Sequence, residues 1–115
     1  MKIHLPYPHK ALWPNGRAHW AAKARETKKH HSWAHTATLA VDDRPKVSDD
    51  KLTVHITVHG KPTGPLPDED NVAAAFKAYQ DGIASAIGID DRHFAAPTVS
   101  FADTRTGKFV VEIGG

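Results

Sequence analysis

The sequence predicts an α+β domain in which two main helices pack on a small mixed β-sheet, in the order β-α-β-α-β-β. Three observations predict this class. Apolar and polar residues alternate over residues 51–59, residues 17–41 and 71–88 have helical character, and two short apolar segments lie within residues 97–113. A length of 115 residues suffices for one modest hydrophobic core, so we expect residues 1–115 to form a single domain.

The composition is typical of a globular protein in water. Hydrophobic residues make up 40% of the chain and charged residues 24%. No apolar run approaches the ~18 residues that are needed to cross a bilayer. Residues 1–16 contain no apolar core of a signal peptide, so the cytoplasm is the expected location. Cysteine is absent, which excludes disulfides and thiolate metal sites.

The N-terminal part of the chain is predicted to form a short strand, a loop and a long helix. Residues 2–5 are the strand candidate, and Pro14, Asn15 and Gly16 are turn residues of the loop. Residues 17–41 are rich in alanine and free of glycine and proline, as expected of a helix. One side of this helix holds mostly small residues, which implies close packing against a neighbour: Trp20, Ala24, Ala34, Ala37 and Val41.

The strand predicted over residues 51–59 has two different sides, which is typical of a half-buried strand. Leu52, Val54, Ile56 and Val58 point one way, and Thr53, His55, Thr57 and His59 point the other. Residues 97–103 and 107–113 are predicted to be two further strands. The turn sequence TRTG (104–107) predicts a hairpin between them.

The second helix has an ordered polar stripe opposite its apolar face. At roughly 100° per residue, Asp70, Lys77 and Asp81 fall within about 20° of one another. Lys77 and Asp81 are i and i+4 neighbours, which are close enough to pair. The opposite sector is apolar and is predicted to face the core: Val72, Ala75, Phe76, Tyr79, Ile83, Ala86 and Ile87.

Acidic residues crowd both ends of this helix, in PDEDN (67–71) and IDD (89–91). Positions i and i+2 of an extended segment point to the same side, so Asp68 and Asp70 repel each other unless a cation is present. Mg²⁺ is typically held by one or two carboxylates and completes its shell with water and phosphate oxygens. The pattern therefore favours a metal site that acts on phosphodiesters, with Lys77 holding a phosphate or the developing charge.

Two other interpretations of these acids were compared with a magnesium site. The helix dipole favours acids in the first turn, and one aspartate is a candidate N-cap, but this explains only one or two of the acids. An EF-hand calcium loop does not fit, because Val72 and Ala73 stand where an oxygen ligand and a glycine are required.

Basic residues gather in residues 17–31, where Glu26 is the only acid. A basic face together with a separate acidic cluster suggests a polyanion held near a cation site. The alternative is a solvated helix face. The basic residues are Arg17, Lys23, Arg25, Lys28 and Lys29.

The nine histidines raise the question of a zinc site. In the segment that begins at His30, His31 and His35 have H-x-x-x-H spacing, but Ser32 stands where the glutamate of H-E-x-x-H is required. Histidines on the helix surface that face phosphate are the favoured interpretation. His55 and His59 are expected on the polar side of a strand, in a groove or a subunit contact.

The chain resembles the RusA family of Holliday junction resolvases, small nucleases of phages and prophages. The family pattern is D-x-D-N, a lysine with an aspartate four residues after it, and a double aspartate past the helix. The opening LPYPHKALWPNGRAHW (5–20) is also similar to the family's N-terminal segment, so the resemblance covers nearly the whole chain. The matching residues are Asp68, Asp70, Asn71, Lys77, Asp81, Asp90 and Asp91.

One departure from the family concerns the lysine. In the best-studied form it follows the second aspartate by four residues, a position that Ala74 holds here. Lys77 lies close to one helical turn further along and so points to the same side. This spacing resembles that of a subgroup found in actinobacterial phages.

The resemblance implies a homodimeric, Mg²⁺-dependent endonuclease, with Mn²⁺ able to replace Mg²⁺, that cuts four-way DNA junctions in recombination and repair. The expected setting is the cytoplasm of a bacterium or phage-infected cell, without a membrane partner. Asp68, Asp70 and Asp91 are implied to bind the metal and, with Lys77, to be catalytic. Asn71, Asp81 and Asp90 are implied to support them.

The resemblance also gives the basic residues of 17–31 a role, which is to contact the phosphates of the junction arms. It makes Trp13 a candidate for stacking on an opened base. A buried anchor is the alternative for this residue. Two other functions stay open: a non-catalytic phage DNA-binding protein on the same scaffold, and a nuclease for other branched DNA.

The distance between the two acid clusters raises a question of assembly. An unbroken helix over residues 71–88 is about 27 Å long at ~1.5 Å per residue. Either a two-fold dimer builds each site from both chains, or the helix breaks near Gly82, or the segment after Gly88 doubles back. We expect the shared dimeric site.

Overall fold

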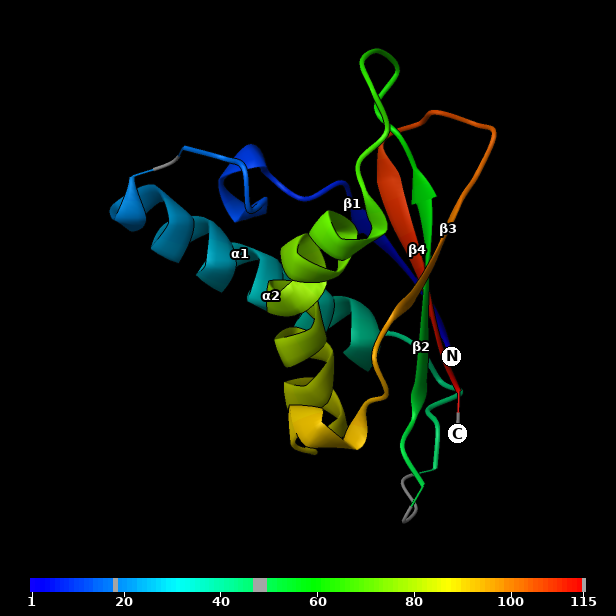
Figure 1. The fold of residues 1–115 in the computed structure, drawn as a ribbon. Helices are drawn as coiled ribbons and strands as arrows, with labels where there is room; N and C mark the ends of the chain where they lie inside the picture. Colours follow the sequence, from blue (N-terminus) through cyan, green and yellow to red (C-terminus); the bar gives the residue numbers. More distant parts are fainter. Residues whose placement is uncertain (18, 47–49, 115) are drawn as a thin grey trace.

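A computed structural model describes residues 1–17, 19–46 and 50–114 of the chain. Four strands and two long helices follow in the order β-α-β-α-β-β, which confirms the predicted class (Figure 1). The 3₁₀ helices η1 (Lys10–Leu12) and η2 (Asp91–His93) lie between them. The main elements are β1 (Lys2–Pro6), α1 (Trp20–Leu39), β2 (Thr53–His59), α2 (Glu69–Ile87), β3 (Thr98–Phe101) and β4 (Lys108–Gly114).

The four strands form one mixed sheet in the order β1-β4-β2-β3. β4 is antiparallel to both β1 and β2, and β3 is parallel to β2. The hairpin predicted at residues 104–107 is therefore wrong, because β3 and β4 lie on opposite sides of β2. The turn signal was local, whereas the partner of each strand is decided by the whole sheet. A parallel pair needs a crossover connection, and α2 provides it between β2 and β3.

Both helices cover the same face of the sheet, as predicted (Figure 1). Side chains of β1 and β2 alternate between more and less buried positions, whereas β4 also buries the three consecutive residues 109–111. Apolar side chains of β1, β2 and β4 meet under the helices. The predicted apolar face of α2 is buried at its centre, while Ala86 and Ile87 are half-buried. The largest core side chains are Tyr79, Phe76, Phe109, Leu52, Ile56 and Ile83.

The two helices cross closely at Gly82. An added Cβ at this position would overlap the carbonyl oxygen of His31 and lie 3.1 Å from the Cβ of Ala34. Of the residues predicted to pack on this side of α1, Ala34 is buried, whereas Ala24 is exposed and Trp20 is 76% exposed. The reason is geometric: the first turns of α1 extend beyond α2 and away from the sheet (Figure 1).

His30 corrects a second expectation, because it is a core residue and not a surface donor. It is 1% exposed and lies against the rings of Trp33 and Tyr79 at 4.7 and 5.1 Å. Its Nδ1 lies 2.7 Å from the carbonyl of Glu26, and its Nε2 accepts from the His9 backbone N–H at 3.1 Å. His30 thus ties the N-terminal loop to α1.

No helix in the described ranges is long and apolar enough to span a bilayer.

Candidate functional site

The acids of PDEDN lie at the start of α2. Asp68 is the N-cap residue with extended backbone angles, but its side chain makes no capping hydrogen bond. Glu69 and Asp70 occupy the first turn, and all three side chains are exposed. Helix capping therefore does not account for Asp68, whose carboxylate is open to a ligand.

The chain turns sharply at the other end of α2. Gly88 takes a left-handed conformation with φ of 84°, which favours glycine, and the backbone N–H groups of Gly88 and Ile89 donate to the Ala84 carbonyl. η2 follows, and the side chain of its N-cap residue Asp90 accepts from the Arg92 N–H at 3.1 Å. α2 is unbroken through Gly82, and the segment after Gly88 doubles back.

Lys77 connects this returning segment to the polar stripe of α2. Its Nζ donates to Oδ2 of Asp91 and lies 3.2 Å from Oδ1 of Asp81. The hydrogen bond to Asp91 raises the pKa of Lys77, and the same bond lowers the pKa of Asp91. Lys77 and Asp91 are therefore both charged at neutral pH, and two carboxylates orient the Lys77 ammonium.

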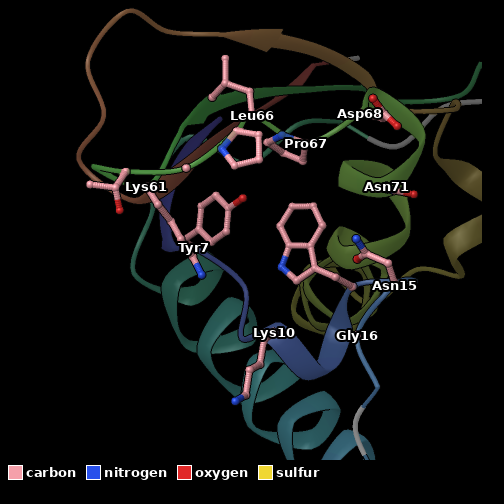
Figure 2. Close-up of a pocket in the computed structure, with 13 residues that line it drawn as sticks. Tyr7, Lys10, Asn15, Gly16, Lys61, Leu66, Pro67, Asp68 and Asn71 are labelled. Carbon is pink, nitrogen blue, oxygen red and sulfur yellow. The ribbon is translucent and has the colours of Figure 1, made fainter.

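A cleft of about 450 Å³ lies beside the start of α2 (Figure 2). Asp68, Asn71 and Asn15 line one side of it, and Lys61 lies on the other. The ring of Tyr7 projects into the space between them. This cleft combines apolar ring surface with amide, carboxylate and ammonium groups, which is the mixture that binding sites for small polar molecules use.

Trp13 packs as an anchor of the N-terminal loop, the alternative considered for it. Its ring stacks on Tyr7 at 5.3 Å between centroids and meets Phe109 edge-on at 6.2 Å. Its indole N–H donates to the Pro8 carbonyl at 3.1 Å. The remaining surface of Trp13 lines the cleft.

A second cleft, of about 360 Å³, lies between α1 and α2. Lys77 and Asp81 line it from α2, and Lys23 and Thr27 line it from α1. Leu12 and Pro14 close it from the N-terminal loop. The loop therefore separates two clefts, one at Asp68 and one at Lys77, and both open along the polar side of α2.

The structure brings together only some of the predicted metal-site residues. Asp91 reaches Lys77 and Asp81 within one chain, while Asp68 and Asp70 remain at the start of the helix. In the described part of the chain, no three carboxylate or histidine side chains are gathered closely enough to hold a metal. The segment after Gly88 doubles back far enough to bring Asp91 to Lys77, but it does not bring Asp91 to Asp68 and Asp70.

The predicted DNA-binding residues of residues 17–31 are exposed, mostly along α1. Glu26 is buried and lies 3.8 Å from Lys29, whose Nζ also lies over the Trp33 ring at 5.2 Å. The other basic side chains have no acidic partner within the described ranges. They are Arg17, Lys23, Arg25 and Lys28.

Sequence reasoning missed four residues around the first cleft. Tyr7, Asn15 and Lys61 line it, and the turn sequence PNG was the only signal for any of them. Arg105 is the fourth residue and supports the loop through hydrogen bonds. Its Nε donates to the Lys61 carbonyl at 2.7 Å, and its guanidinium also donates to the Gly64 carbonyl. It holds the loop that leads into Asp68, and its place in a turn near the C-terminus gave no sign of that role.

No family model matches the chain. The chain is similar to a protein of Xylella fastidiosa that is described as uncharacterized, with 36% identity over 121 residues that cover 96% of this chain and 74% of the relative. The chain belongs to the family of this protein. Membership fixes ancestry and not activity, so the functional argument rests on the arrangement of the site.

Proposed function

We propose that this chain is a RusA-like, Mg²⁺-dependent endodeoxyribonuclease that cuts four-way DNA junctions. The observation that supports this best is the contact of Lys77 with Asp81 and Asp91 on the helix that begins at Asp68 and Asp70. Asp81 and Asp91 thus meet at one lysine, while Asp68 and Asp70 stand at the start of the same helix. A purely structural helix would not need the six acids of residues 68–91.

The chemistry of the donor set fits Mg²⁺. Asp68 and Asp70 offer exposed carboxylates that no described side chain neutralises, and one or two carboxylates suffice when water and phosphate oxygens complete the shell. When bound, the ion supplies activation of water and stabilisation of charge on a phosphodiester. Asp91 is the third proposed ligand, and Asn71, Asp81 and Asp90 support the set.

Lys77 is proposed to act on the phosphate. Its pKa is raised by Asp91, so the ammonium stays charged at physiological pH. Two carboxylates hold it in place beside the second cleft, where a phosphate can approach. A fixed, charged donor stabilises negative charge that develops during cleavage.

The remaining expectations follow the same proposal. The partner is branched DNA, which the basic residues of α1 contact through phosphates. The enzyme acts as a homodimer in the cytoplasm of a bacterium or phage-infected cell. The competing function is a non-catalytic DNA-binding protein on this scaffold.

Exchange of one carboxylate separates the two functions, because carboxylates beside phosphates oppose simple DNA binding. We expect Asp70→Asn to abolish Mg²⁺-dependent cleavage of a four-way junction while binding is kept or becomes tighter. Glu69→Gln is the matched control, because it removes the neighbouring charge of the same turn and should still cut. Normal cleavage by Asp70→Asn contradicts the assignment.

Substrate choice needs its own comparison. The parent protein is incubated with a four-way junction, a replication fork and a linear duplex of equal length, each with Mg²⁺ and with Mn²⁺. We expect paired cuts in the junction and little cleavage of the duplex. Preferred cleavage of the fork would make the protein a nuclease for other branched DNA.

A further inference from the structure

The first half of α1 presents an aromatic ring in a position that the fold does not explain. Trp20 is 76% exposed, whereas large aromatic side chains are normally mostly buried. Its only aromatic neighbour in the described chain is the His19 ring, at 5.4 Å and tilted. One face of the indole is therefore available to a partner.

Trp20 stands at the head of a groove on α1. The groove has a volume of about 720 Å³ and follows the i, i+3, i+4, i+7 and i+8 positions of one helix face. Its walls are the indole, two small or hydroxyl side chains, the aliphatic stems of two lysines and an imidazole. These residues are Trp20, Lys23, Ala24, Thr27, Lys28 and His31.

The charges around the groove point to the chemistry of its occupant. Lys23 and Lys28 line it, and the exposed Arg25 lies on the same helix. The nearest acid of α1, Glu26, is buried and lies beside Lys29 and His30, so it does not offset these cations. An exposed aromatic ring beside two lysines suits a nucleotide of a single strand. Its base can stack on the ring while the backbone phosphates contact the ammonium groups.

The groove adjoins the proposed active site. Lys23 and Thr27 line both this groove and the second cleft, where Lys77 and Asp81 lie. A strand that follows α1 from the Trp20 ring therefore passes Lys23 and Thr27 and meets the second cleft beyond them.

We infer that Trp20 is a stacking platform for an unpaired nucleotide of the DNA substrate, and that the groove guides the attached single strand toward Lys77. The inference rests on the proposed function, because DNA is the partner that this function requires. It gives Trp20 the stacking role for which the sequence had offered Trp13 as a candidate, since the Trp13 ring packs against Tyr7 and Phe109.

The test measures binding of the full chain to a short oligothymidylate and to a duplex of equal length, without Mg²⁺. We expect Trp20→Ala to weaken binding of the oligothymidylate about 5- to 150-fold, the range for loss of one base–aromatic stack, and to leave duplex binding unchanged. The affinity of Trp20→Phe for the oligothymidylate should lie between that of the parent and that of Trp20→Ala. Binding should also quench tryptophan fluorescence in the parent but much less in Trp20→Ala.

Trp33→Phe is the matched control, because Trp33 is 38% exposed on the same helix but is already covered by the Lys29 ammonium. It should bind both DNAs as the parent does. Each variant's thermal unfolding is recorded to show that the fold is kept.

Four outcomes would overturn the inference. Trp20→Ala could bind oligothymidylate as tightly as the parent, or lose duplex and single strand equally, which would indicate a general effect on charge or fold. Loss of concentration-dependent self-association without loss of DNA binding would identify a second copy as the occupant. A parent that binds no DNA at all removes the proposed function as well, and this result is distinct from the other three.

Discussion

Lys77 donates to Oδ2 of Asp91, a residue that lies beyond the end of the same helix and returns to it through the turn at Gly88. We predict that Lys77→Met raises the pKa of Asp91 toward the ordinary aspartate range, because the hydrogen bond that lowers it is lost. Titration of the aspartate carboxyl carbons by NMR measures this directly. Lys51→Met, which removes an exposed charge elsewhere on the protein, should leave the pKa of Asp91 as it is in the parent. An unchanged pKa in Lys77→Met would mean that the contact does not form.

The buried His30 makes stability depend on pH. Burial lowers its pKa below the ordinary value of 6.5, so the unfolded chain binds a proton more readily than the folded chain. Stability therefore falls as the pH drops below about 6.5 toward the lowered pKa. The neighbouring groups shift the pKa of His30 in opposite directions. Glu26 favours the charged imidazole, whereas His9 and Lys29 oppose it.

His30→Phe provides the test of that dependence. The variant should be less stable at neutral pH, by about 1–3 kcal/mol, because the His9 N–H loses its acceptor. It should lose less stability than the parent on acidification, as measured by urea unfolding at several pH values. His35→Gln is the control on the same helix and should keep the parental pH profile.

Gly82 sets how closely α1 and α2 approach. Gly82→Ala should destabilise the protein by about 1–3 kcal/mol through overpacking against His31 and Ala34, which outweighs the ~1 kcal/mol gain in helix propensity. Ser85→Ala lies on the exposed side of the same helix and should change the free energy of unfolding by less than about 0.5 kcal/mol. A stabilised Gly82→Ala would show that the helices can move apart without loss.

If the proposed nuclease is a dimer, mixing of two inactive variants tests whether one chain or two build each proposed active site. Because Asp91 contacts Lys77 of its own chain, we expect mixed dimers of Asp70→Asn and Asp91→Asn to remain inactive in junction cleavage. Mixing must be demonstrated, for example with two chains of different length. Recovery of cleavage would show that one site of the mixed dimer is intact and hence that two chains share each site, as the sequence alone had suggested.

The elements of this fold were predictable because each has a local cause. The alternation in β2 and the 3.6-residue period of α2 follow from burial of one side, and both are visible in the sequence. The partner of β3 was not predictable, because the turn before β4 shows only that the chain bends there. Packing of β3 beside β2 depends on how α2 crosses the sheet.

In the candidate site too, local contacts were predictable from the sequence and contacts that depend on the path of the chain were not. Lys77 and Asp81 share a helix face, so their pairing could be predicted from spacing. The return of Asp91 to Lys77 depends on Gly88 and η2, whose path has no periodic signal. The exposure of Trp20 depends on where α2 crosses α1, which no property of residues 17–41 reveals.

The position of β4 between β1 and β2 governs the order in which the protein can be completed during synthesis. Among the described strands β1 pairs with β4 and not with β2, so β1 stays unpaired until residues 108–114 have been made, whereas β2 can first pair with β3. At roughly 10 residues per second, β1 spends on the order of ten seconds outside the ribosome before its partner exists. Throughout that interval, the apolar side chains of Ile3 and Leu5 have no sheet to join. The nascent chain is therefore the form of this protein that most needs a chaperone, and the site on α2 gains a complete sheet to support it only once β4 has been made.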